Sequence, residues 1–107
     1  MNIMDKIIMT NHEQYLELVR LMREGCKKTR PIQGMFYSRS KYDEFTCALG
    51  AIHYAFNLEN ISKDPNLFRK KFPVLSKTRC FCSQIAAKND SGVYTREEIA
   101  NWLETLE

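Results

Sequence analysis

The clearest hydrophobic pattern lies near the start of the chain, where a polar capping motif precedes apolar residues at helical spacing. Thr10 and Glu13 form an S/T-x-x-E capping box, in which each side chain accepts a backbone amide of the first turn. The apolar residues that follow occupy positions i, i+3, i+4 and i+7, which share one helical face: Tyr15, Leu18, Val19 and Met22. Gly25 stands where a C-terminal cap is usual. The pattern predicts an amphipathic helix over residues 11–24.

The same pattern recurs at the end of the chain. Thr95 and Glu98 form a second capping box. The apolar residues after it again share one helical face: Ile99, Trp102, Leu103 and Leu106. This segment predicts a packing helix without chemistry of its own.

Another helix is expected over residues 43–57, opened by Asp43 and Glu44, because acidic side chains suit the positive end of the helix dipole. Its buried face is predicted to hold Phe45, Ala48, Leu49, Ile52 and either Ala55 or Phe56. Small residues allow another helix to approach closely: Ala48, Gly50, Ala51 and Ala55. A copy of the chain is one candidate for that helix, so a homodimer is left open.

Proline and glycine delimit the weaker elements. Asp64-Pro65 pairs an N-cap residue with proline at the first helical position, which predicts a short helix that Pro73 ends. We further expect an extended pair at 74–75, a short helix over 80–87 and a turn over 89–92.

Residues 27–41 lack a helical period and contain Pro31, Gly34 and several serines and arginines, so they are predicted to form a long connection. A short strand or turn is expected at 33–37. The predicted fold class is mainly α: a compact bundle of four to five helices with at most a short strand or hairpin, in a single helical domain over residues 1–107.

Composition agrees with a folded domain, and charge adds the first indication of a partner. The chain is 44% hydrophobic and has six Phe, five Tyr and one Trp, which is unlike a disordered segment. Its net charge of +3 is unevenly distributed. Residues 20–41 hold seven Lys or Arg against one acid, residues 63–79 hold six against one, and residues 90–107 hold one against five. Basic surfaces attract acidic proteins or polyanions, although a solvated face is the simpler interpretation.

The candidate binding residues are therefore basic, and they fall into two groups. The first group interleaves with Tyr37 and Tyr42, as in proteins that bind single-stranded nucleic acid: Arg30, Arg39 and Lys41. The second group could contact phosphates from the short helix near Pro73: Arg69, Lys70, Lys71, Lys77 and Arg79.

The cysteines are candidates for a metal site, and a buried structural role is the alternative. The four cysteines are Cys26, Cys47, Cys80 and Cys82, and His53 could take the place of one of them as a metal ligand. The spacing of Cys80 and Cys82 is one residue shorter than the C-x2-C knuckle of structural zinc sites. Free cysteine also packs as a small hydrophobic residue, which is the better interpretation of Cys47 beside Ala48 and Leu49.

No catalytic constellation emerges from the remaining polar residues. Cys47 and His53 are six positions apart, so their side chains diverge by about 120° on a helix and cannot form a nucleophile–base pair. His53 is predicted to flank the core, whereas His12 is expected to be exposed. The sequence has no Gly-rich phosphate loop, G-x-S-x-G or H-E-x-x-H motif, so we expect neither an enzyme nor a cofactor.

The sequence indicates neither a membrane span nor an export signal. No stretch approaches the ~18 apolar residues of a transmembrane helix. Residues 1–9 include an acid and lack a small-residue cleavage site, so they do not resemble a signal peptide. We expect a cytoplasmic protein with reduced thiols and no membrane partner.

Two stretches resemble a group of small, uncharacterised proteins of phages and bacterial genomes: T-C-A-L-G-A at 46–51 and Y-T-R-E-E-I-A-N-W-L-E at 94–104. That group carries a C-A-L-G-A helix, a step like Phe72-Pro73, a cysteine segment and a closing W-T-R-E-x-I-A-x-W-L helix, in the order seen here across residues 43–105. Its cysteine segment is often C-P-x-C, and a histidine loop often precedes its last helix. Here residues 80–82 are shorter and residues 88–92 lack histidine. The resemblance implies a shared fold unit and a mobile-element origin, with no known activity.

Taken together, these patterns favour a small non-enzymatic protein-interaction module whose surface is built from residues 27–42 and 63–79. The alternative is a nucleic-acid-binding protein that uses the same basic face. A second alternative is a thiol-metal protein that binds zinc through the cysteines.

Overall fold

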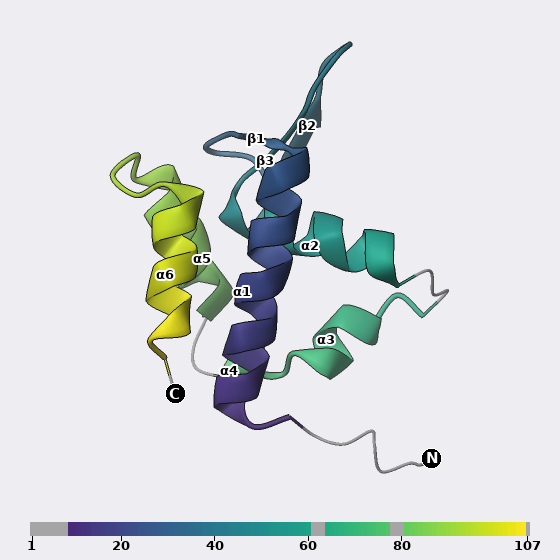
Figure 1. Ribbon diagram of the computed structural model, residues 1–107, viewed down its shortest axis with the longest axis vertical. Helices are drawn as coiled ribbons and strands as arrows, with labels where there is room; N and C mark the ends of the chain where they lie inside the picture. Colours follow the sequence, from purple (N-terminus) through teal and green to yellow (C-terminus); the bar gives the residue numbers. More distant parts are fainter. Residues whose placement is uncertain (1–8, 61–63, 78–80, 107) are drawn as a thin grey trace.

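The computed structural model describes residues 9–60, 64–77 and 81–106, and within them the chain is mainly helical, as predicted. Figure 1 shows the elements. In order along the chain they are α1 (Asn11–Lys28), β1 (Arg30–Pro31), β2 (Tyr37–Arg39), β3 (Glu44–Thr46), α2 (Ala48–Glu59), α3 (Leu67–Lys71), α4 (Val74–Lys77), α5 (Phe81–Asp90) and α6 (Arg96–Glu104).

The first helix begins where the sequence predicts and ends four residues later. Thr10 and Glu13 form the predicted capping box, with the Glu13 amide donating to the Thr10 hydroxyl at 3.1 Å and the Thr10 amide donating to the Glu13 carboxylate at 2.8 Å. The prediction that Gly25 caps the helix is wrong, because Gly25 is buried inside α1 and the helix continues to Lys28.

Gly25 marks the point at which α1 and α2 are closest. A Cβ atom at Gly25 would lie 2.6 Å from the carbonyl carbon of Ala51 and closer still to its oxygen. Ala48, Ala51 and Ala55 are almost completely buried, so the small residues of α2 do receive another helix, and that helix is α1 of the same chain. They are not exposed for packing on a copy, which removes the stated basis for a homodimer.

The predicted start of the second helix is also wrong. Residues 44–46 are extended and form β3, because they pair with strands from the preceding connection. Helix α2 begins only at Ala48, and Cys47 is its N-cap, with the thiol accepting the Gly50 amide at 3.3 Å. Glu44 therefore lies on a strand instead of in a first helical turn.

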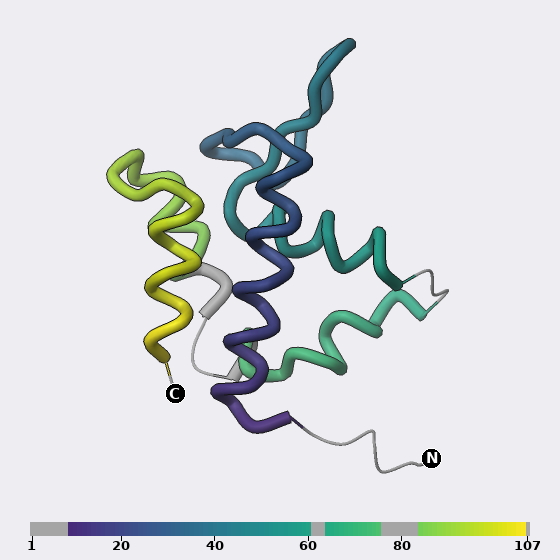
Figure 2. Tube along the Cα trace, in the orientation of Figure 1, coloured from purple at the N-terminus to yellow at the C-terminus, as the bar shows by residue number. Residues whose placement is uncertain are grey.

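Residues 30–46 form a small mixed sheet, which exceeds the single short strand or hairpin that was expected. Its strand order is β1-β3-β2, with β1 parallel and β2 antiparallel to the central β3. Tyr37 pairs with Thr46, and Arg39 pairs with Glu44. The tube in Figure 2 shows the β2–β3 hairpin projecting beyond the C-terminal end of α1.

In the second half of the chain three predicted helices are present, two of them with shifted boundaries, and one predicted extended segment is helical. Helix α3 begins two residues after Pro65, and the Asp64 carboxylate accepts the Asn66 amide at 2.9 Å in the turn before it. Residues 74–75 are helical within α4, although the sequence predicted them to be extended. Helix α5 continues to Asp90, and α6 begins with the predicted capping box of Thr95.

The core lies between α1 and the helices around it. Helix α1 packs on both α2 and α6, and α5 contacts α2 and α6. Figure 1 shows α2 crossing α1 at a steep angle, so the helices do not all run along one axis as in an up-and-down bundle. The largest hydrophobic side chains that are fully buried come from five helices and from Phe72, which lies between α3 and α4: Leu18, Leu21, Met22, Ile52, Phe72, Val74, Ile85, Ile99 and Leu103.

Candidate functional site

An open groove separates the β2–β3 hairpin from α2. Its volume is about 600 Å³, and its lining is largely aromatic and aliphatic: Phe36, Tyr37, His53, Tyr54 and Leu58, with Gly50 and Asn57. Glu44 also contributes to the wall. We refer to this feature as the aromatic groove.

The hairpin is held against α2 by backbone contacts. The Cys47 amide donates to the Phe36 carbonyl at 3.3 Å, immediately before α2 begins. A Cβ atom at Gly50 would lie 3.1 Å from the Phe36 carbonyl carbon, so glycine makes this close approach possible. The position of Phe36 at the groove therefore depends on the first turn of α2.

Glu44 is the carboxylate of the groove, and two tyrosines hold it. The Tyr37 hydroxyl donates to Oε2 at 3.0 Å, and the Tyr54 hydroxyl donates to Oε1. These hydrogen bonds, that of Tyr54 first, lower the pKa of Glu44 because they favour the charged form. They also raise the pKa of Tyr54 and of Tyr37. The groove thus contains a fixed negative charge at neutral pH.

His53 lies at the base of the groove, between two phenylalanines. Its ring centroid is 5.0 Å from that of Phe36 and 3.9 Å from that of Phe68. Burial lowers the pKa of His53, so the imidazole is neutral at pH 7. The prediction that His53 flanks the core is confirmed.

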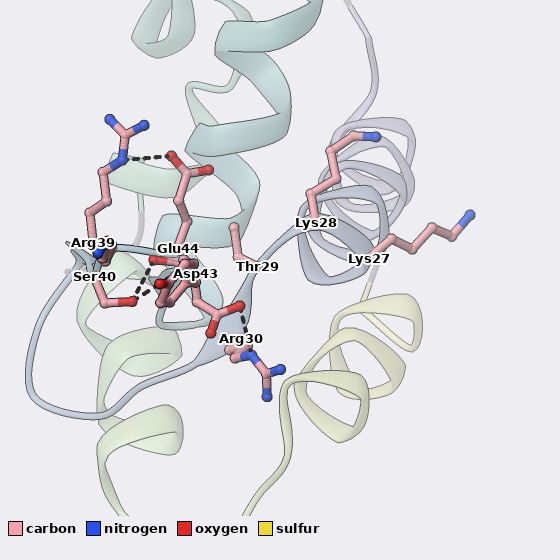
Figure 3. A pocket seen from close by; sticks show the side chains of 10 residues that line it. Lys27, Lys28, Thr29, Arg30, Arg39, Ser40, Asp43 and Glu44 are labelled. Carbon is pink, nitrogen blue, oxygen red and sulfur yellow. Dashed lines mark hydrogen bonds and ion pairs between the residues drawn. The ribbon is translucent and has the colours of Figure 1, made fainter.

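A second pocket, of about 500 Å³, adjoins the same hairpin and shares Glu44 with the aromatic groove (Figure 3). It gathers the three predicted residues of the first basic group, Arg30, Arg39 and Lys41. Two lysines of the last turn of α1 join them, Lys27 and Lys28. We refer to this feature as the basic pocket.

The cations of the basic pocket do not converge on one point. In Figure 3 the Arg30 and Arg39 side chains extend in opposite directions, and Lys27 and Lys28 extend away from both. Arg30 forms an ion pair with Asp43 at 3.1 Å, and Arg39 approaches Glu44 at 3.7 Å. The pocket therefore presents a diffuse positive surface, and both of its arginines already lie beside a carboxylate, Asp43 or Glu44.

The second predicted basic group lies elsewhere. Arg69, Lys70 and Lys71 are on α3, which Figure 1 places at a distance from the hairpin, so these three residues do not form one continuous face with residues 27–42. Lys70 pairs with Asp64 at 2.9 Å. The predicted contributions of Lys77 and Arg79 lie outside the described part, because the side chain of Lys77 and all of Arg79 are not described.

The cysteines show structural roles where they are described. Cys47 is buried as the N-cap of α2, and Cys26 is half-buried, with its pKa raised by burial. The predicted Cys80 and the side chain of Cys82 lie outside the described residues. Over the part of the chain that is described, no group of three or more His, Cys, Asp or Glu side chains is arranged to hold a metal ion.

A buried polar network joins the two halves of the fold, and sequence reasoning missed it. The Arg96 guanidinium donates to the Thr29 and Thr46 hydroxyls at 2.9 and 3.0 Å. Asn89 accepts the Ala48 amide at 2.9 Å and donates to the Ile32 carbonyl at 2.9 Å. These partners are far apart in sequence, so no local sequence pattern predicts their hydrogen bonds. The network ties α5 and α6 to the sheet and to the start of α2.

The chain matches no known protein-family model, no curated protein and no solved structure. The resemblance to small phage and bacterial proteins therefore stays a prediction. Within the described residues, no helix combines the length and the apolar character that a bilayer span requires.

Proposed function

We propose that this protein is a small non-enzymatic module that binds another protein through the tip and groove side of its β2–β3 hairpin. The observation that carries the proposal is the clustering of exposed apolar side chains. Of the eight large hydrophobic residues that are exposed in the described part, four fall in residues 35–42, and two of these, Phe36 and Tyr37, line the aromatic groove together with Leu58. Single exposed hydrophobic residues are ordinary, whereas a contiguous group is typical of an interaction site.

Tyr42 adds to this argument. Its side chain is 84% exposed near the end of the projecting hairpin, next to Lys41, whose ammonium lies 5.4 Å from the ring centre. Tyrosine offers a large rigid contact area with a polar end, and it is enriched at interfaces for that reason. An exposed tyrosine on a projecting hairpin is well placed to reach a partner.

The groups that would be needed for catalysis have structural roles, which supports the non-enzymatic part of the proposal. The Cys47 thiol caps α2, and the His53 ring contacts the edge of Phe36 and the tilted ring of Phe68. A cytoplasmic location and a mobile-element origin belong to the same proposal and rest on the sequence features alone.

Site-specific photocrosslinking in the native host tests the proposal. We would place p-benzoylphenylalanine at Phe36 or Tyr42, and at Leu16 or Val93 as exposed control positions outside the hairpin. The expected result is one protein adduct of the same mass from both hairpin positions and none from the controls. Equal adducts at all four positions, or no adduct at the hairpin, would refute the proposal.

Nucleic-acid binding is the second candidate, and the basic pocket is the observation that favours it. Five Lys or Arg side chains line this pocket beside Tyr42. The test is fluorescence anisotropy with a labelled 20-nucleotide oligo-dT between 50 and 200 mM salt, where phosphate binding weakens steeply with salt, by roughly tenfold or more for several contacts. Reversing the charges of Lys27, Lys28 and Lys41 should abolish it. The matched reversal of Arg69, Lys70 and Lys71 should leave it intact, and equal loss from both variants would exclude the pocket as the site.

Zinc binding through the cysteines is tested separately. Native mass spectrometry of protein never exposed to chelator would show added mass if a zinc ion is bound. Substitution of Cys80 and Cys82 by serine should remove that mass if they are ligands, whereas an apo mass in the unsubstituted protein would exclude the thiol-metal alternative.

A further inference from the structure

The aromatic groove differs from the rest of the surface in its charge. The protein carries +3 overall, and the neighbouring basic pocket, which shares Glu44 with the groove, holds five cations. The groove has no Lys or Arg in its lining, and its single charged group is the carboxylate of Glu44. His53 adds no charge at neutral pH, because burial lowers its pKa. A partner group that enters this groove therefore meets aromatic surface and one negative charge.

The two tyrosine hydrogen bonds of Glu44 leave acceptor positions unused on its carboxylate oxygens. A carboxylate offers two acceptor positions on each oxygen. Tyr37 occupies one position on Oε2, and Tyr54 occupies one on Oε1, so one position on each oxygen is left over. An N–H group of a guanidinium can donate to such a position, and the charge of the carboxylate strengthens that hydrogen bond.

The walls of the groove suit the rest of such a side chain. Phe36, Tyr37 and Tyr54 present aromatic surface, and Leu58 is 54% exposed at the edge. Arginine stacks on aromatic rings and buries its aliphatic stem along apolar surface, which a small hydrated cation cannot do. Phe36 and Leu58 would then contact the apolar neighbours of that arginine.

We propose that the aromatic groove binds an arginine side chain, flanked by apolar residues, that a partner protein presents to Glu44. This inference rests on the proposed interaction function and names the chemistry of the partner. Arg39 is the internal competitor, because its Nε lies 3.7 Å from Glu44 Oε2. Its side chain is 71% exposed, so this contact is weak and a partner arginine can displace it.

The experiment is a titration of ¹⁵N-labelled protein with the peptide N-acetyl-Leu-Arg-Leu-amide, monitored by amide chemical shifts. The matched control peptide replaces arginine with citrulline, which keeps the shape and removes the charge. We expect saturable shifts at Tyr37, Glu44 and His53 with the arginine peptide, and about tenfold weaker binding of the citrulline peptide. Equal binding of both peptides, or no saturable shift at the groove, would overturn the proposal.

Two substitutions sharpen the result. Glu44→Gln should weaken binding of the arginine peptide about tenfold, because it removes the charge and one acceptor. Arg39→Ala should bind that peptide at least as tightly as the unsubstituted protein. If the peptide binds only after Arg39→Ala, the groove is occupied by Arg39 of the same chain and the proposal is wrong. If Glu44→Gln does not fold, the citrulline comparison in the unsubstituted protein still decides.

The failure of the arginine inference can be told apart from the failure of the interaction function. A crosslinked partner at Phe36 together with no peptide binding would reject arginine recognition and leave the interaction function standing. Absence of any crosslink would reject the interaction function, and peptide binding would then describe a groove that has no protein partner in the cell, which also overturns the inference.

Discussion

Replacing Gly25 with alanine is expected to force α1 and α2 apart. The added Cβ would lie 2.6 Å from the Ala51 carbonyl carbon and 2.9 Å from its Cα, whereas carbon atoms in contact prefer about 3.5 Å or more. The helices must therefore separate by roughly 1 Å, because backbone atoms cannot rotate out of the way as a side chain can. Leu18 and Met22, which are fully buried on α1, would lose contacts at the same time.

The magnitude follows from two opposing effects. Overpacking of a tight core costs typically about 1–3 kcal/mol. The upper part of that range applies because the added Cβ contacts backbone atoms of Ala51. Alanine is favoured over glycine inside a helix by about 1 kcal/mol, which offsets part of the cost. We expect a net loss of about 2 kcal/mol in the free energy of unfolding, and a fall in Tm of roughly 10 °C for a domain of this size.

Urea denaturation followed by far-UV circular dichroism measures the effect. Glu24→Ala is the matched control in the same turn: its carboxylate is partly exposed and pairs with Lys27 at 3.1 Å, so a change within about 0.5 kcal/mol is expected. The reasoning would be refuted if Gly25→Ala left the stability unchanged or raised it. An increase of about 1 kcal/mol is what an uncrowded helical glycine would give.

Three further outcomes test the contacts around the groove and the network. Burial lowers the pKa of His53, so on acidification the unfolded state takes up a proton before the folded state does. The free energy of unfolding should therefore be constant above about pH 6.5 and fall below it. Urea midpoints measured between about pH 7.5 and 5.5 would show this fall, and the substitution His53→Leu should flatten the profile. Asn89→Ala leaves the Ala48 amide without its 2.9 Å acceptor, which should cost about 1–3 kcal/mol by thermal unfolding; no change would show that the cap is dispensable. Arg96→Met removes the bonds to Thr29 and Thr46 and should cost a similar amount, about 1.5–3 kcal/mol, with loss of amide-exchange protection in β1 and β3; unaltered protection would contradict the proposed tie.

The local signals were sufficient for the outer helices. The capping boxes of Thr10 and Thr95 are contacts between residues three apart, and the apolar faces behind them repeat every three or four residues. Such patterns need no information from elsewhere in the chain, so α1 and α6 begin where the sequence predicts. The same is true of the mainly helical character of the chain.

The failures share a different cause. Residues 44–46 were predicted to be helical because acids suit a helix start, but pairing with residues 30–31 and 37–39 makes them a strand. Gly25 resembles a cap locally, and its real function is to admit Ala51 of another helix. Both outcomes depend on pairing or packing with residues at least five positions away, which local propensity does not contain.

The candidate site was only partly visible in the sequence for the same reason. The sequence by itself determined where the basic and aromatic residues of 30–42 lie along the chain, and the tertiary structure distributed them between two adjacent pockets that share Glu44. Glu44 gained its role only when Tyr37 and Tyr54 came to donate to it from β2 and α2. Helix caps and amphipathic faces are set by neighbours in sequence, whereas grooves, close helix crossings and buried polar networks exist only once distant segments meet.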